Sequence, residues 1–95
     1  MNKKVVSLCQ LAFRAGKVSY GSRLIPSIQT RQAKLVCLSP FCGKNRTKKL
    51  HDKCAFYHIP CLTLADWDAI SKKSIQSFAI LDEGFAQAIL EEMKG

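Results

Sequence analysis

The sequence contains few acidic residues, no long apolar run and none of the common catalytic motifs. Its 95 residues include 7 Asp and Glu against 15 Lys and Arg, which gives a formal net charge of +8. No apolar run approaches the roughly 20 residues that a membrane-spanning helix needs. The short apolar stretch near the N-terminus does not resemble a secretory signal, because Gln10 and Arg14 interrupt the apolar residues after it. We therefore expect a cytoplasmic protein outside the membrane.

The chain also lacks the motifs of nucleotide-binding and hydrolytic enzymes. There is no Gly-x-Gly-x-x-Gly, no Gly-x-x-x-x-Gly-Lys loop and no nucleophile elbow. Asp66 and Asp68 are two residues apart on an expected helix, so they do not share a face. Asp82 and Glu83 are expected in the first turn of another helix, where acidic groups favour the helix dipole. The sequence therefore predicts a protein without catalytic residues or a cofactor.

Its cysteines do not form a metal-binding pattern. There are five of them, Cys9, Cys37, Cys42, Cys54 and Cys61, and no Cys-x-x-Cys pair occurs. A zinc site can be drawn from four residues, Cys42, His51, Cys54 and His58, but their spacing matches no common zinc motif. We expect free thiols, as is usual in a reducing compartment, and no metal.

Apolar periodicity alternates between helical and extended spacing along the whole chain. The expected helices cover Lys3–Ala15, a segment between Ser22 and Arg31, Asn45–Phe56, Asp66–Ser71 and a segment after Asp82. The expected strands cover Lys17–Tyr20, Ala33–Leu38, Cys61–Leu64 and Ile75–Leu81. Gly16 is expected to end the first helix in a left-handed conformation, and Asn45 to cap the third. The alternation predicts one α/β domain over residues 1–95, with a small sheet sandwiched between helices.

Basic residues cluster near the expected loops. The clusters are Arg14, Lys17 and Arg23; then Lys44, Arg46, Lys48 and Lys49; then Lys72 and Lys73. Because alternate loops of an α/β layer fold emerge at one end of the sheet, we expect Lys17, Arg23 and Lys72 to gather there. Phosphates of a nucleic acid are the commonest partner of such a charge excess, and Gly21 leaves the main chain open to close approach.

Most aromatic residues are expected in the core. Four phenylalanines fall on apolar faces: Phe13, Phe56, Phe78 and Phe85. Tyr20 and Phe41 are expected in loops, where an aromatic ring can stack on an RNA base.

Several segments resemble the kink-turn-binding ribosomal-protein superfamily. Arg14-Ala15-Gly16-Lys17 followed by Gly21 is similar to its first helix and binding loop. The segments that match later elements are Ala33–Val36, Asn45–Leu50, Asp52–Cys54 and Ile59-Pro60. Asp82-Glu83-Gly84-Phe85-Ala86 resembles the C-terminal segment of the bacterial YlxQ branch. The resemblance implies a three-layer α/β/α sandwich with a small mixed four-stranded sheet, and binding of kinked RNA, as in ribosomal RNA.

The resemblance also implies which residues bind RNA. Carried over, the first contact region is Lys17, Gly21, Ser22, Arg23, Leu24 and Ser27, and the second is Ser71, Lys72, Lys73 and Ser74. Archaeal and eukaryotic members read base pairs with an Asn-Glu pair, whereas this chain has Arg23 and Leu24 there. Phosphate binding is therefore expected more than base reading.

The main hypothesis is a monomeric, non-catalytic RNA-binding protein. The alternative is a protein-interaction module whose basic face binds an acidic protein partner. Affinity capture with and without ribonuclease distinguishes them, because a protein partner survives nuclease treatment.

Overall fold

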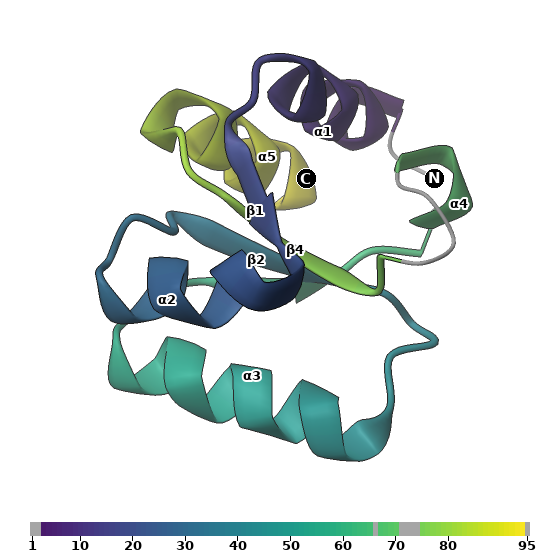
Figure 1. Ribbon diagram of the computed structural model, residues 1–95. Coiled ribbons are helices and arrows are strands. Elements are labelled where there is room, and N and C mark those ends of the chain that lie inside the picture. Colours follow the sequence, from purple (N-terminus) through teal and green to yellow (C-terminus); the bar gives the residue numbers. More distant parts are fainter. Residues whose placement is uncertain (1–2, 66, 71–74, 95) are drawn as a thin grey trace.

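A four-stranded mixed sheet lies between two layers of helices in the computed structural model, which describes residues 3–65, 67–70 and 75–94 (Figure 1). The helices are α1 (Lys3–Arg14), α2 (Leu24–Gln29), α3 (Lys44–Phe56), α4 (Trp67–Ile70) and α5 (Glu83–Lys94), with a short 3₁₀ turn, η1, at Gly21–Arg23. The strands are β1 (Val18–Tyr20), β2 (Leu35–Leu38), β3 (Cys61–Thr63) and β4 (Ser77–Ile80). The predicted three-layer fold class is confirmed.

The strand order is β1-β4-β2-β3, with β4 antiparallel to both of its neighbours and β2 parallel to β3. Every residue of the two central strands, β2 and β4, is buried. This agrees with their largely apolar sequences, which are typical of strands covered on both faces.

Alternate side chains of the central strands enter two separate cores, because successive residues of a strand point to opposite faces. Leu35, Cys37, Phe78 and Ile80 pack with residues of α1, α4 and α5. Val36, Leu38 and Ala79 pack with residues of α2 and α3. The sheet thus separates an α1/α4/α5 layer from an α2/α3 layer (Figure 1).

The ends of the helices follow from local backbone chemistry. Gly16 adopts a φ of 70° and its N–H donates to the carbonyl of Phe13, while the N–H of Lys17 donates to Ala12. This is the predicted left-handed end of α1. The prediction that Asn45 caps α3 is wrong by two residues: Gly43 is the cap, without a side-chain hydrogen bond.

One expected burial assignment is wrong. Phe56 is 73% exposed, although its spacing favoured the core. It is the last residue of α3, which buries Leu50 and Cys54 against the sheet instead. Phe13 and Phe85 pack, partly buried, against the α1/α4/α5 core, as expected.

Candidate nucleic-acid interface

The sheet has two ends with different loops, and strand pairing decides which loops meet. Tyr20 pairs with Phe78, and Leu38 pairs with Ser77 and Thr63. Three strands, β1, β2 and β3, therefore end where β4 begins, and we call this end of the sheet the Gly21 end. At the opposite end, which we call the Lys17 end, β1, β2 and β3 begin and β4 ends.

A hollow of about 350 Å³ opens at the Gly21 end. It is lined by Tyr20, Gly21, Arg46, Ile75, Gln76 and Ser77. These residues come from the β1–η1 junction, the first turn of α3 and the entry to β4, so three segments distant in sequence meet there. Tyr20 is 48% exposed, which leaves part of its ring accessible from solvent.

Gly21 shapes this hollow through its backbone. Its φ of 63° lies in the left-handed region, which side chains other than glycine's adopt only with strain. Apart from Gly21 and its two chain neighbours, no residue has an atom within 4 Å of the position that a Cβ would take, so the main chain faces open space there. A ligand can therefore approach the backbone closely.

Arg46 is the basic side chain of the hollow. Its guanidinium donates a long hydrogen bond of 3.5 Å to the hydroxyl of Ser77, the first residue of β4. Within the described part of the chain, neither Arg46 nor Arg23 forms an ion pair with a carboxylate. Both cations are exposed, so both are available to an anionic ligand.

Arg46 was placed in a basic cluster from the sequence but was not assigned to the site. Finding it requires knowing that the loops after β1 and β2 leave the sheet at the same end. That follows from β4 lying between these two strands, antiparallel to each. Nothing in the local sequence around Arg46 reveals this strand order.

The expectation that Lys17 joins this group is wrong. Lys17 precedes β1, and its carbonyl accepts from the N–H of Leu81, just after β4. Gly21 follows the same strand, four residues away, which corresponds to roughly 13 Å at the rise of an extended chain. Lys17 therefore lies at the opposite end of the sheet from the hollow.

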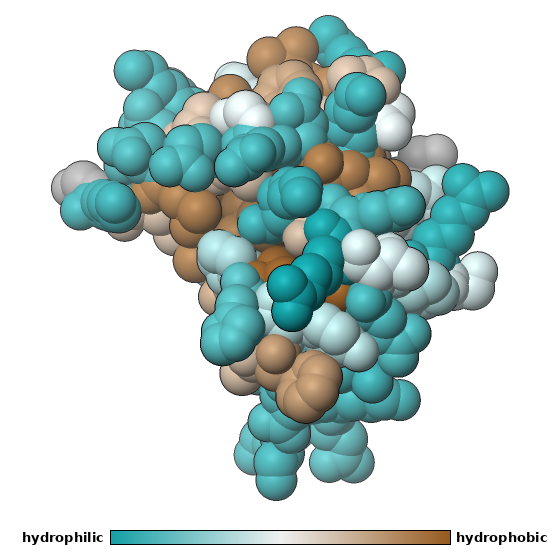
Figure 2. Space-filling view, turned by 90° about the vertical axis from the view of Figure 1, so that its left-hand side faces the viewer, coloured by the Kyte–Doolittle hydropathy of each residue, from teal (hydrophilic) through white to brown (hydrophobic). Residues whose placement is uncertain are grey.

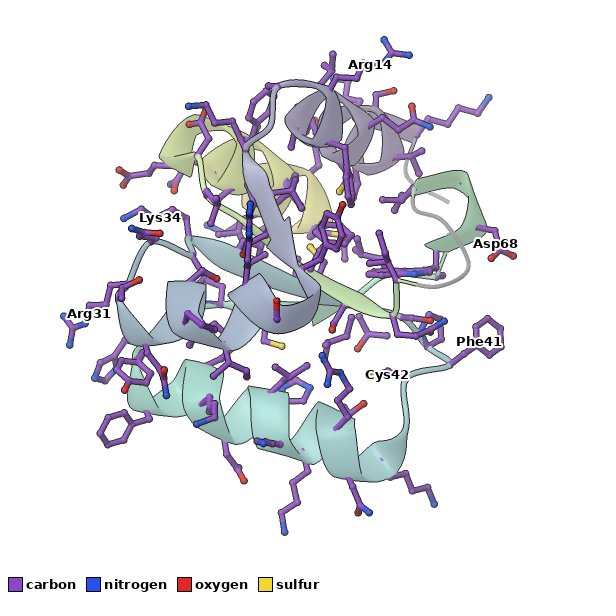
Figure 3. The ribbon with its side chains drawn as sticks, in the orientation of Figure 1. Arg14, Arg31, Lys34, Phe41, Cys42 and Asp68 are labelled. Carbon is purple, nitrogen blue, oxygen red and sulfur yellow. The ribbon has the colours of Figure 1, made fainter. Side chains whose placement is uncertain are left out.

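The Lys17 end also carries Lys34 and Arg31 (Figure 3). The N–H of Lys34 donates to the carbonyl of Ile80, which fixes its place beside the exit of β4. Two acidic residues, Asp82 and Glu83, follow β4 at this end. Figure 2, which looks onto it, shows a largely hydrophilic surface with hydrophobic side chains visible between the polar ones.

Two of the residues carried over from the resemblance turn inward. Leu24 is fully buried in the α2/α3 core. Ser27 is 5% exposed, and its hydroxyl lies 2.7 Å from that of Ser19 and donates to the Leu24 carbonyl at 2.6 Å. Ser27 therefore joins α2 to β1, and neither the Leu24 nor the Ser27 side chain lies on the surface.

The remaining predicted residues divide into two groups. Ser22 and Arg23 are exposed in η1, directly after Gly21. Ser71, Lys72, Lys73 and Ser74 lie outside the described residues, as does Asp66. The structure thus places Gly21, Ser22 and Arg23 at one end of the sheet and adds Arg46.

The cysteines form two contacts inside the fold. A hydrogen bond with Cys9, together with burial, raises the pKa of the Cys37 thiol, and a hydrogen bond with Cys54, together with burial, raises the pKa of Cys61. All five thiols are free.

Among residues 3–65, 67–70 and 75–94, no three candidate ligands come together for a metal. No described helix is long and apolar enough to cross a membrane.

Comparison with known proteins decides the family. The chain is 35% identical to the RNA-binding protein YlxQ of Enterococcus faecium, over 98% of this chain and 94% of that protein. The chain belongs to the YlxQ family. The YlxQ protein of Bacillus subtilis is also 35% identical, over 87% of this chain and 88% of its own. No protein-family model matches the sequence.

Solved structures support the same fold for this YlxQ family member. A protein of unknown function from Bacillus halodurans superposes with a TM-score of 0.88 at 30% identity, with both chains fully covered. A 15.5 kD RNA-binding protein of Giardia lamblia superposes with a TM-score of 0.74 at 11% identity, over 99% of this chain and 88% of that one. At 11% identity the likeness concerns the fold alone.

Proposed function

We propose that this protein binds structured RNA at the Gly21 end of its sheet, without catalysing a reaction. The YlxQ proteins of Enterococcus faecium and Bacillus subtilis are named as RNA-binding proteins, and the chain matches both over most of its length. We also propose that the protein is a monomer and that it binds ribosomal or other folded RNA in the cytoplasm.

The hollow at the Gly21 end is the observation that carries the proposal. Three groups line it: the backbone of Gly21, which no side chain covers, the exposed aromatic ring of Tyr20 and the guanidinium of Arg46. Guanidinium groups bind phosphate through paired N–H donors. The open backbone and the ring suit a sugar or a base at the same place.

The chemistry of η1 indicates what kind of RNA fits. Arg23 replaces the amide of the Asn-Glu pair in the related binders, and Leu24 replaces the carboxylate and is buried. A buried leucine cannot read a base edge, whereas an exposed arginine binds phosphates of any sequence. We therefore propose recognition of a kinked internal loop, such as a kink-turn, through its backbone shape.

A pair of double variants tests the site. In Arg23→Glu/Arg46→Glu, two cations of the Gly21 end are reversed. In the control, Lys3→Glu/Lys94→Glu, two cations of the α1/α4/α5 layer are reversed, so both proteins lose the same net charge. We expect roughly 10- to 100-fold weaker binding of an internal-loop RNA for the first variant, because hydrogen bonds from charged groups are lost. The control should stay near the wild type.

The salt dependence of binding is the second measurement. The logarithm of the binding constant should fall linearly with the logarithm of the salt concentration, and the slope should shrink by about 1 for each phosphate contact removed. A slope near zero for the wild type would contradict RNA binding through phosphates. Equal affinity for a straight duplex of the same length would contradict recognition of a kink.

A further inference from the structure

Phe41 is the most exposed large hydrophobic side chain among the described residues, at 79%. Burying a phenylalanine stabilises a protein by about 1.5–3 kcal/mol relative to leaving it in water. Because its ring stays exposed, Phe41 does not give the described fold this stabilisation. Aromatic side chains contribute much of the energy of an interface when a partner buries them.

The loop that carries Phe41 is held in place by hydrogen bonds. The N–H of Ser39 donates to the Gln76 carbonyl at 2.9 Å, which ties the loop to the entry of β4. The N–H of Phe41 donates to the Ser39 hydroxyl at 3.0 Å, and that of Cys42 to the Ser39 carbonyl at 3.1 Å. The backbone beneath the ring is therefore fixed, while the ring points away from the body of the protein (Figure 3).

The surroundings of Phe41 are basic and adjoin the proposed RNA site. A second hollow, of about 330 Å³, is lined by Ser39, Pro40, Cys42, Lys44, Thr47, Lys48 and Thr63. Lys44 and Lys48 are exposed, and Gln76, which binds the loop, also lines the Gly21 hollow. Asp68 of α4 lies on the same side of the molecule and points outward (Figure 3).

We propose that Phe41 stacks on an unpaired base of the bound RNA, while Lys44 and Lys48 hold phosphates beside it. This inference rests on the proposed function and adds a second contact region to it. Stacking suits any base, because each has a π-face, so Phe41 contributes affinity for single-stranded or splayed nucleotides without selecting a sequence. The fixed loop reduces the entropy lost on binding, because the backbone is already ordered.

Substitution of Phe41 tests the inference on the internal-loop RNA that the wild-type protein binds. Phe41→Ala should weaken binding roughly 5- to 150-fold, the equivalent of one lost stacking contact. Phe41→Trp should bind at least as well as the wild type. Phe41→Leu keeps a large apolar side chain but has no π-face, and it should bind as weakly as Phe41→Ala. The slope of the salt dependence should stay unchanged in all three, because no charge is altered.

Phe56 provides the matched control. It is also an exposed phenylalanine, at 73%, but it is the last residue of α3, at the far end of that helix from Lys44. Phe56→Ala should bind RNA like the wild type, which would show that loss of an exposed ring does not by itself lower affinity.

Each result separates the two proposals. If the wild type binds RNA and Phe41→Ala binds equally well, stacking at Phe41 is overturned while the proposed function stands. If Phe41→Leu binds as well as Phe41→Trp, a simple apolar contact replaces stacking and the inference is overturned. If the wild type binds no RNA, both proposals fail together.

Discussion

The two helical layers cover the sheet in the same way but differ in charge. The helices α1, α4 and α5 carry four basic residues, Lys3, Lys4, Arg14 and Lys94, and four acidic ones, Asp68, Glu83, Glu91 and Glu92. The elements η1, α2 and α3 carry six basic residues, Arg23, Lys44, Arg46, Lys48, Lys49 and Lys53, and one acidic residue, Asp52. The helices of one layer are balanced, and those of the other hold most of the excess positive charge.

Folding requires the buried apolar side chains of both layers, but it does not require the positive charge of one layer. Both layers bury apolar side chains against the sheet, so packing explains both. A one-sided charge does not help packing, because like charges on a surface repel each other. The positive charge of the α2/α3 layer is therefore best explained by an anionic partner at that face and at the adjoining Gly21 end.

Truncating a core side chain should cause the largest loss of stability, and the loss should be similar in the two layers. Ile89 of α5 and Leu50 of α3 are both buried, one in each core. Replacing either by alanine should lower the free energy of unfolding by about 2–5 kcal/mol, because each leaves a cavity beside the sheet. Urea denaturation of the two variants measures this. A loss below about 1 kcal/mol for Leu50→Ala alone would mean that α3 is attached by something other than its apolar side.

The two left-handed glycines should carry a similar backbone strain. Gly16 ends α1 with a φ of 70°, and Gly21 begins η1 with a φ of 63°. At both positions the space that a Cβ would occupy is free of other atoms within 4 Å, so the strain of the backbone is the common cost. Alanine at either position should destabilise the protein by about 1–2 kcal/mol.

RNA binding should distinguish these two glycine variants. With the folded fraction measured by circular dichroism, Gly16→Ala should bind RNA like the wild type, and Gly21→Ala should bind more weakly, because Gly21 lines the hollow. Equal affinities would place the RNA away from the Gly21 end and remove the main contrast between the two regions.

The order of elements could be predicted from the sequence, because each depends on local spacing. The buried strands Leu35–Leu38 and Ser77–Ile80 follow from nearly continuous apolar residues, and the left-handed turn at Gly16 follows from the absence of a side chain. The end of α3 is a partial exception. The expected end at Phe56 agrees with the structure, but the left-handed φ of 58° that His58 adopts just after it was not predicted.

The composition of the site could be predicted only in part, because it depends on strand order. Gly21 and Arg23 are neighbours in sequence, so the local pattern grouped them correctly. Lys17 is only four residues before Gly21, but β1 carries the chain across the sheet between the two. Arg46 is far away in sequence and comes to the hollow through the pairing of β2 with β4.

The smallest expected effect concerns the caps of the two long helices that follow a strand. α5 begins behind Asp82, whose carboxylate accepts from the N–H of Gly84 at 2.8 Å, whereas α3 begins behind Gly43, without such a bond. Serine or aspartate at position 43 supplies a cap and should raise the free energy of unfolding by a few tenths of a kcal/mol, about the difference between these residues and glycine. Stability should therefore rise similarly in Gly43→Ser and Gly43→Asp, as measured by thermal unfolding.

The same two variants test how far the RNA extends along α3. Only the aspartate adds a negative charge beside Lys44, so RNA affinity should fall in Gly43→Asp and remain at the wild-type level in Gly43→Ser. An equal affinity of the two variants would show that the start of α3 lies outside the reach of the RNA. The charge contrast between the layers would then need another explanation, because the basic first turn of α3 would serve neither packing nor binding.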